Sequence, residues 1–187
     1  QRVDANPSPL DLLWYVPNGY AGPRGAQVPF DKYFRGVEAV TFRSAWEDPN
    51  ALFVGFKGAS KQKNHHNLDA GTFVFDALGV RWAQELGADN YNLPGYFGAQ
   101  RWDYYRMRAE GQNVLVINPG TGPEQDETKE IQMSRVESSP QDALAIADLT
   151  EAYAKDAIKA ERGIRLFDNR RTMVVQDEGY AKAPSDV

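Results

Sequence analysis

The chain has 187 residues, a formal net charge of −5 and no cysteine. Hydrophobic residues make up 42% of it and aromatic residues 12%, which excludes a disordered protein and suits a single domain. No apolar run approaches the roughly 20 residues that a membrane-spanning helix needs, and the acidic excess argues against nucleic acid as a partner. Because the first residue is Gln1, we expect a processed chain or a piece of a longer one.

Residues 1–36 follow no regular pattern, because prolines and glycines are frequent after one short apolar run. Within this stretch only the region Asp11–Tyr15 could form a turn or two of helix. We therefore predict that residues 1–36 are a linker and that a folded domain occupies residues 37–187. The last eight residues, from Tyr180 onward, resemble a frayed tail or a cut end.

From residue 37 onward, short runs rich in β-branched and aromatic residues are separated by turn residues, which is typical of strands. About nine such runs predict an all-β fold, an antiparallel β-sandwich. One helical candidate, Ala152–Glu161, lies in a connection and is expected as a short helix. The predicted strands are Val37–Trp46, Ala51–Lys57, Gly71–Leu78, Val80–Leu86, Asn113–Asn118, Glu130–Val136, Leu144–Leu149, Arg162–Phe167 and Thr172–Gln176.

Both histidines of the chain are adjacent, at His65 and His66, and they precede a strongly apolar strand. In an extended chain they point to opposite faces, so we do not expect them to act together on one substrate atom. A polar turn with one exposed and one hydrogen-bonded histidine is the simpler interpretation. The functional alternative is a general acid or base, or a donor to an anionic substrate.

A second feature combines aromatic residues and arginines between Tyr91 and Arg108. Aromatic faces stack on the apolar faces of sugar rings, and arginine makes bidentate contacts to carboxylates, so the combination suits an acidic carbohydrate. The structural alternative is a strand and its loop, in which the aromatics pack and the arginines pair with acidic residues. The side chains concerned are Tyr91, Tyr96, Phe97, Arg101, Trp102, Tyr104, Tyr105, Arg106 and Arg108.

The stretch Asn64–Val74, with the preceding Lys57 and Gly58, resembles the signature of the heparinase II/III-like polysaccharide lyases. In that family the segment typically reads Asn-His-x-His-Leu-Asp-x-Gly-Ser-Phe. The similarity extends from about residue 10 to about residue 178. Its further motifs are Asp31–Gly36, Phe42–Trp46, Leu86–Tyr91 and Glu110–Val116.

The resemblance implies a β-sandwich that follows an N-terminal α/α toroid and closes over a cleft. It implies that the parent protein cleaves a uronate-containing polysaccharide by β-elimination, in the periplasm or outside the cell. Most of the catalytic residues of the family come from the toroid, so we expect this chain alone to be nearly inactive. Its partners would be an acidic polysaccharide and the rest of the parent chain.

The family places a histidine at the position of His65, which makes it the first candidate for the site. The resemblance gives as further candidate catalytic residues the tyrosines Tyr96, Tyr104 and Tyr105. The candidate substrate-binding residues are Asn64, Arg101, Trp102, Arg106 and Arg108.

A zinc site that the family often carries in this sandwich is altered here. Its three positions are occupied by Asn67, Glu85 and Gln112. Because neutral amide oxygens are poor zinc ligands, we predict no zinc and no other cofactor. A hydrogen-bonded cluster of these three residues could replace the metal, and a loose Ca²⁺ site is the weaker alternative.

Three alternatives to a lyase module remain at the level of the sequence. The chain could be a non-catalytic carbohydrate-binding or scaffold module, or a degenerate homologue that has lost activity along with the zinc ligands. It could also be a structural domain whose aromatic run is mostly core, which burial of Trp102, Tyr104 and Tyr105 would support.

Overall fold

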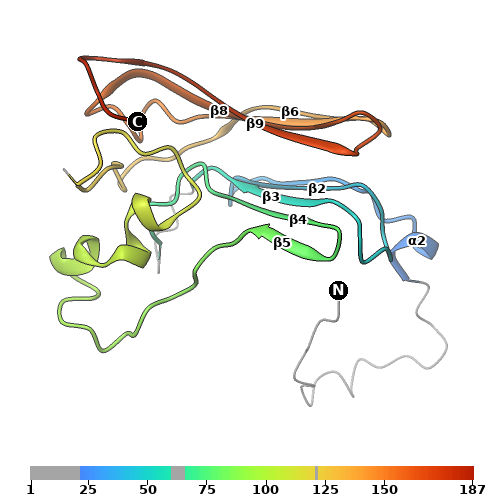
Figure 1. Ribbon diagram of the computed structural model, residues 1–187, viewed down its shortest axis with the longest axis horizontal. Helices are drawn as coiled ribbons and strands as arrows, with labels where there is room; N and C mark the ends of the chain where they lie inside the picture. The colour runs from blue at the N-terminus through green and yellow to red at the C-terminus, as the bar shows by residue number, and fades with distance from the viewer. Residues whose placement is uncertain (1–21, 60–65, 121) are drawn as a thin grey trace.

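The computed structural model describes residues 22–59, 66–120 and 122–187. In these residues two antiparallel sheets lie face to face, and each sheet follows the order of its strands along the chain (Figure 1). The first sheet is formed by β1 Lys32–Phe34, β2 Ala39–Arg43, β3 Phe53–Lys57, β4 Phe73–Ala77 and β5 Val80–Ala83. The second is formed by β6 Met133–Ser138, β7 Ala143–Asp148, β8 Ala157–Phe167 and β9 Thr172–Ala181.

The helices of the described residues are short and lie outside the sheets. A four-residue helix, α2 Gly22–Gly25, precedes the first sheet. Three 3₁₀ helices lie between β5 and β6, namely η1 Ala99–Asp103, η2 Tyr105–Met107 and η3 Ala109–Gly111. No helix in the described part of the chain is long and apolar enough to cross a membrane.

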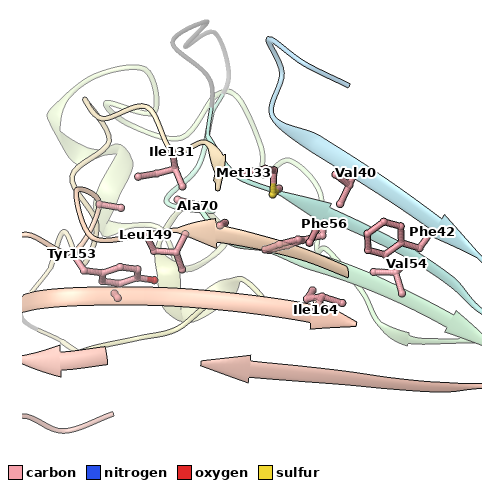
Figure 2. Packing of buried hydrophobic residues seen from close by; sticks show 14 of the residues in the cluster. Val40, Phe42, Val54, Phe56, Ala70, Ile131, Met133, Leu149, Tyr153 and Ile164 are labelled. Atoms are coloured by element: carbon pink, nitrogen blue, oxygen red, sulfur yellow. The ribbon is translucent and has the colours of Figure 1, made fainter. Parts of the chain in front are cut away.

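The alternation of apolar and polar residues positions the core. In β2 and β3 every second residue is buried, and the register pairs Val40 with Phe56 and Phe42 with Val54. These side chains meet Ile164 and its neighbours from the second sheet, as Figure 2 shows. The core therefore lies between the sheets, as the strand pattern predicts.

Tyr153 closes one end of this core (Figure 2). Its side chain is fully buried, and its hydroxyl donates to the backbone carbonyl of Leu115 and accepts from the amide of Gln125. The same Gln125 side chain bonds both the N–H and the C=O of Ala70. Burial raises the pKa of Tyr153. The connections from β3 to β4, from β5 to β6 and from β7 to β8 are thus held together at one end of the sandwich.

The predicted antiparallel sandwich is confirmed, but the predicted helix Ala152–Glu161 is wrong. Residues 150–156 form turns, and from Ala157 the chain runs as β8, the longest strand of the described residues. Alanine-rich sequence fits a helix by local preference, whereas here pairing with β7 and β9 decides the structure.

Other boundaries also differ from the prediction. The first sheet begins with β1, inside the predicted linker 1–36, because Tyr33 pairs with Val40. The predicted strand Asn113–Asn118 is irregular. The expected tail is ordered into β9 as far as Ala181. The predicted turn of helix at Asp11–Tyr15 lies outside the described residues.

Glu38 is a buried carboxylate through which the stability of the fold is expected to depend on pH. Its carboxylate accepts hydrogen bonds from the Tyr33 hydroxyl at 2.5 Å and from the backbone N–H of Met133 at 3.1 Å and Gly36 at 3.2 Å. Burial alone would raise the pKa of Glu38, but these donors outweigh it and hold the pKa below its usual value. Conversely, burial and the Glu38 carboxylate raise the pKa of Tyr33 to about 12.

We therefore expect Glu38→Gln to flatten the acid dependence of stability. A carboxylate with a lowered pKa stabilises the fold above the pKa of the unfolded chain, and this contribution is lost as the pH falls through the folded-state pKa. Urea denaturation from about pH 6 to pH 3 should thus show a smaller loss of stability in the variant than in the wild type. An equally steep loss in both would contradict this assignment, and exposed Glu151→Gln serves as the control.

Candidate functional site

The histidine segment follows β3, and the structure describes it only from His66 onward. The candidates Asn64 and His65 lie outside the described residues. His66 is held through its backbone, because its carbonyl oxygen accepts from Nε of Arg101 at 3.0 Å and from Nη2 at 2.6 Å. A backbone bond of 2.9 Å from the N–H of Leu68 to the carbonyl of Met107 fixes the same region. The histidine segment and the aromatic–arginine segment are therefore joined at one end of the sandwich.

The His66 ring lies in a small polar environment. It packs against Trp102 with the ring centroids 5.6 Å apart, and its Nε2 lies 3.3 Å from a carboxylate oxygen of Glu127, a contact that becomes an ion pair when the imidazole is protonated. The adjoining hollow of about 50 Å³ also holds the 2.6 Å ion pair of Lys57 and Asp69. Acidic and basic side chains thus both line the hollow beside His66.

Arg101 is a buried structural residue in this arrangement. It is 8% exposed, and its guanidinium also bonds the carbonyl of Tyr96 at 3.2 Å and Oδ1 of Asn67 at 3.1 Å. The prediction that Arg101 contacts a uronate does not fit these bonds, because the guanidinium donates to protein acceptors from all three nitrogens. In the structure its guanidinium holds the chain at His66 and Asn67.

Tyr96 also lies in the interior, although its position predicts a cleft-facing aromatic. The residue is 3% exposed, and its hydroxyl contacts the sulfur of Met107 and the backbone N–H of Asp89, each at 3.3 Å. Its ring packs edge-on against Phe97 with a centroid distance of 5.0 Å. A buried hydroxyl of this kind cannot reach a polysaccharide, so Tyr96 supports the segment instead.

The remaining tyrosines and Trp102 lie nearer the surface. Tyr105 is 61% exposed, whereas Trp102 is half-buried between His66 and Arg101. The hydroxyl of Tyr104 donates to the carbonyl of Pro94 at 2.6 Å. Of the three candidate catalytic tyrosines, Tyr105 is the one with an exposed side chain.

Arg106 and Arg108 differ in the hydrogen bonds and ion pairs that their guanidinium groups form with the protein. Arg106 is exposed and donates from Nη1 to the carbonyls of Leu86 and Ala88, at 3.0 and 3.2 Å. Arg108 lies between Glu110, at 2.8 Å, and the buried carboxylate of Glu124, and the hydrogen bond with Glu124 raises the pKa of Arg108. Arg106 is therefore the freer candidate for a substrate carboxylate.

The residues that the resemblance places at the family's zinc positions, Asn67, Glu85 and Gln112, do not form the hydrogen-bonded cluster that could have replaced a metal. Asn67 bonds Arg101, Glu85 accepts from the N–H of Gly87 at 2.6 Å, and Gln112 donates to the carbonyl of Arg106 at 2.7 Å. Each holds a different part of the chain. Among the described residues no group of three or more His, Cys, Asp or Glu side chains could hold a metal ion.

Sequence reasoning did not single out the two glutamates of this site. Glu124 binds Arg108, and Glu127 lies beside His66. Both belong to an acidic connection that precedes β6. The negative charge of this connection could have indicated the two glutamates, because the arginines of the aromatic segment require acidic partners from elsewhere in the chain.

Comparisons with known proteins bear on the fold. No family model matches the chain, and no curated protein matches it in sequence. Among solved structures, heparan sulfate lyase HepC from Pedobacter heparinus aligns with a TM-score of 0.64 at 16% identity, covering 83% of this chain. A heparinase III gene product aligns with a TM-score of 0.67 at 18% identity over the same share.

The chain has the fold of a part of these heparinases. The predicted structural resemblance is thereby confirmed at the level of the fold. The chain spans 23% of the length of each of these two lyases, so it corresponds to less than a quarter of either. The likeness is therefore one of fold, to a part of each of these two proteins.

Proposed function

We propose that the chain is the β-sandwich module of a polysaccharide lyase that cleaves a uronate-containing glycan by β-elimination. The observation that carries the proposal is the bond between Arg101 and His66, which joins the histidine and aromatic–arginine segments. The shared fold with two heparinases supports the same conclusion. We further propose that the parent protein is periplasmic or secreted and supplies an α/α toroid.

The reaction assigns a different task to each group. A base removes the proton from C5 of the uronate, the C4–C5 double bond forms, the bond from C4 to O4 breaks, and an acid protonates O4. We assign a proton transfer to His65, whose family position has a histidine, and contact with the uronate carboxylate to Arg106. Tyr105 is the exposed hydroxyl available for stacking or for the second proton transfer.

His65→Ala in the full-length parent tests the catalytic assignment. Absorbance of the unsaturated uronate product would be followed on alginate, heparan sulfate, chondroitin and hyaluronan. Because a positioned acid or base contributes about 10²–10⁴-fold, kcat on the cleaved substrate should fall by that factor in the variant. The matched control His66→Gln, at the neighbour whose ring packs on Trp102, should keep kcat within a few-fold.

A non-catalytic carbohydrate-binding or scaffold module is the second candidate function. It is favoured by the burial of Tyr96, a candidate catalytic residue that is 3% exposed and whose hydroxyl is engaged by Met107. A parent that binds one glycan but releases no product from any of the four would establish this alternative. A variant at His65 that changes KM alone would also favour binding over catalysis.

A further inference from the structure

A groove on the outer face of the first sheet lies apart from the candidate site. It has a volume of about 720 Å³ and is bordered by α2, the connection from β2 to β3 and the turn from β4 to β5. On its floor one register row crosses four strands, because Arg43 pairs with Phe53, Phe53 with Asp76 and Asp76 with Arg81. The row places two guanidinium groups and one buried carboxylate side by side.

Arg43 is held in the groove by two aromatic rings. The carbon of its guanidinium lies 4.2 Å from the centroid of the Trp46 ring and 4.3 Å from that of Phe53. Stacking fixes the plane of the group but uses none of its N–H donors. Within the described ranges no hydrogen bond or ion pair engages this guanidinium, although its side chain is half-buried. Burial lowers the pKa of Arg43, and the group keeps its charge at neutral pH.

The second arginine of the row is already neutralised. Arg81 donates from Nε and Nη2 to the two oxygens of Asp76, at 2.6 and 2.9 Å. The pair leaves the charge of Arg43 in excess on the floor. Two acidic side chains, Glu47 and Asp48, lie on the exposed rim, and Glu47 is 4.0 Å from Arg24. Among the described residues the groove therefore combines an excess positive charge at its floor with hydrogen-bond acceptors at its edge.

We propose that this groove is a second binding site for an acidic saccharide of low charge density. In it, the carboxylate of a uronate ring meets the fixed guanidinium of Arg43, and ring hydroxyls donate to Glu47 and Asp48. The acidic rim disfavours a densely sulfated chain, because each additional sulfate faces a like charge. The choice of ligand rests on the proposed function, whereas the binding itself requires no turnover.

The test is calorimetric binding of a hyaluronan hexasaccharide, which carries carboxylates and no sulfates, to the chain and its variants. Arg43→Gln should weaken binding by about tenfold or more, because a charge-assisted hydrogen bond to the ligand is lost. The control Arg35→Gln removes an exposed guanidinium that lies 4.8 Å from the Tyr33 ring outside the groove, and it should leave affinity within twofold.

A second pair of variants tests the same proposal in case Arg43→Gln does not fold. Val80 is 51% exposed and lines the groove, whereas Leu78, in the adjoining turn, is 70% exposed and does not. We expect Val80→Glu to weaken binding by repelling the carboxylate and Leu78→Glu to leave it unchanged. The proposal would be overturned if neither Arg43→Gln nor Val80→Glu weakened binding of the hyaluronan hexasaccharide. Equal binding of neutral chitohexaose, or tighter binding of a heparin hexasaccharide, would overturn it as well.

This outcome is separable from that of the proposed lyase activity. If the parent cleaves a uronate glycan and the groove variants bind normally, the second site is refuted and the lyase stands. If the chain binds the hexasaccharide through Arg43 and the parent yields no product, the groove is supported and the lyase is refuted. A parent in which Arg43→Gln lowers kcat on a short substrate would instead place the groove within the reacting site.

Discussion

Arg170→Ala should lower the free energy of unfolding by about 3–5 kcal/mol, because it leaves a buried carboxylate without its counter-charge. The Arg170 side chain is 3% exposed and that of its partner Asp31 is 7% exposed. Two parallel hydrogen bonds of 2.7 and 2.6 Å join them. Arg170 lies in the turn from β8 to β9, and Asp31 lies directly before β1, so the pair ties the two sheets together.

The remaining donors of Arg170 make the loss larger than that of a simple ion pair. They reach the carbonyls of Arg43 at 2.7 Å, at the end of β2, and of Pro140 at 3.1 Å and Ser139 at 2.5 Å, in the connection from β6 to β7. Alanine would leave these acceptors unpaired, and a buried acceptor without a donor costs about 1–3 kcal/mol by itself. Arg170→Met, which fills the volume, should therefore recover only a small part of the stability.

The neighbouring arginine provides the matched control. Arg171 binds Asp168 at 2.8 Å, but their side chains are 71% and 48% exposed. Exposed pairs contribute about 0–1 kcal/mol, so Arg171→Ala should change stability by no more than that. Urea denaturation of both variants measures the difference. Equal losses would show that the pair Asp31–Arg170 contributes no more than a surface contact.

The contrast between these two adjacent arginines shows where sequence reasoning ends. Two-residue periodicity predicts β2, β3, β4, β7 and much of β9, because one face of each strand must be buried. No local pattern distinguishes Arg170 from Arg171, since the partner of Arg170 is 139 positions away in the chain. Long-range ion pairs of this kind are properties of the folded chain alone.

The same limit applies to the candidate site. The sequence singled out two segments, and the structure joins them through His66 and Met107. The sequence alone does not distinguish exposed from buried side chains within the segment of 3₁₀ helices, because a turn of three residues has no sustained amphipathic period. Tyr96 and Tyr105 therefore carry the same signal in the sequence and lie in opposite environments.

Arg101→Met is the second large effect that we expect. The substitution keeps an apolar stem in the buried position and removes every donor to His66, Asn67 and Tyr96. Stability of the chain should fall by about 2–4 kcal/mol, because several part-buried acceptors lose their partner at once. Arg106→Met is the control, since that exposed guanidinium bonds only the carbonyls of Leu86 and Ala88 in the described part of the chain, and it should cost less than about 1 kcal/mol.

The catalytic consequence of Arg101→Met distinguishes positioning from bulk stability. His65 directly precedes the residue whose carbonyl Arg101 holds, so loosening that carbonyl displaces the proposed proton-transfer group without removing it. A misplacement of about 1 Å can cost about a hundredfold in rate, so kcat of the folded parent should fall while KM changes little. Assays well below the unfolding transition of the variant measure this split. A rise of KM at constant kcat would instead identify Arg101 as a direct substrate contact, and unchanged kinetics would show that the histidine segment does not depend on it.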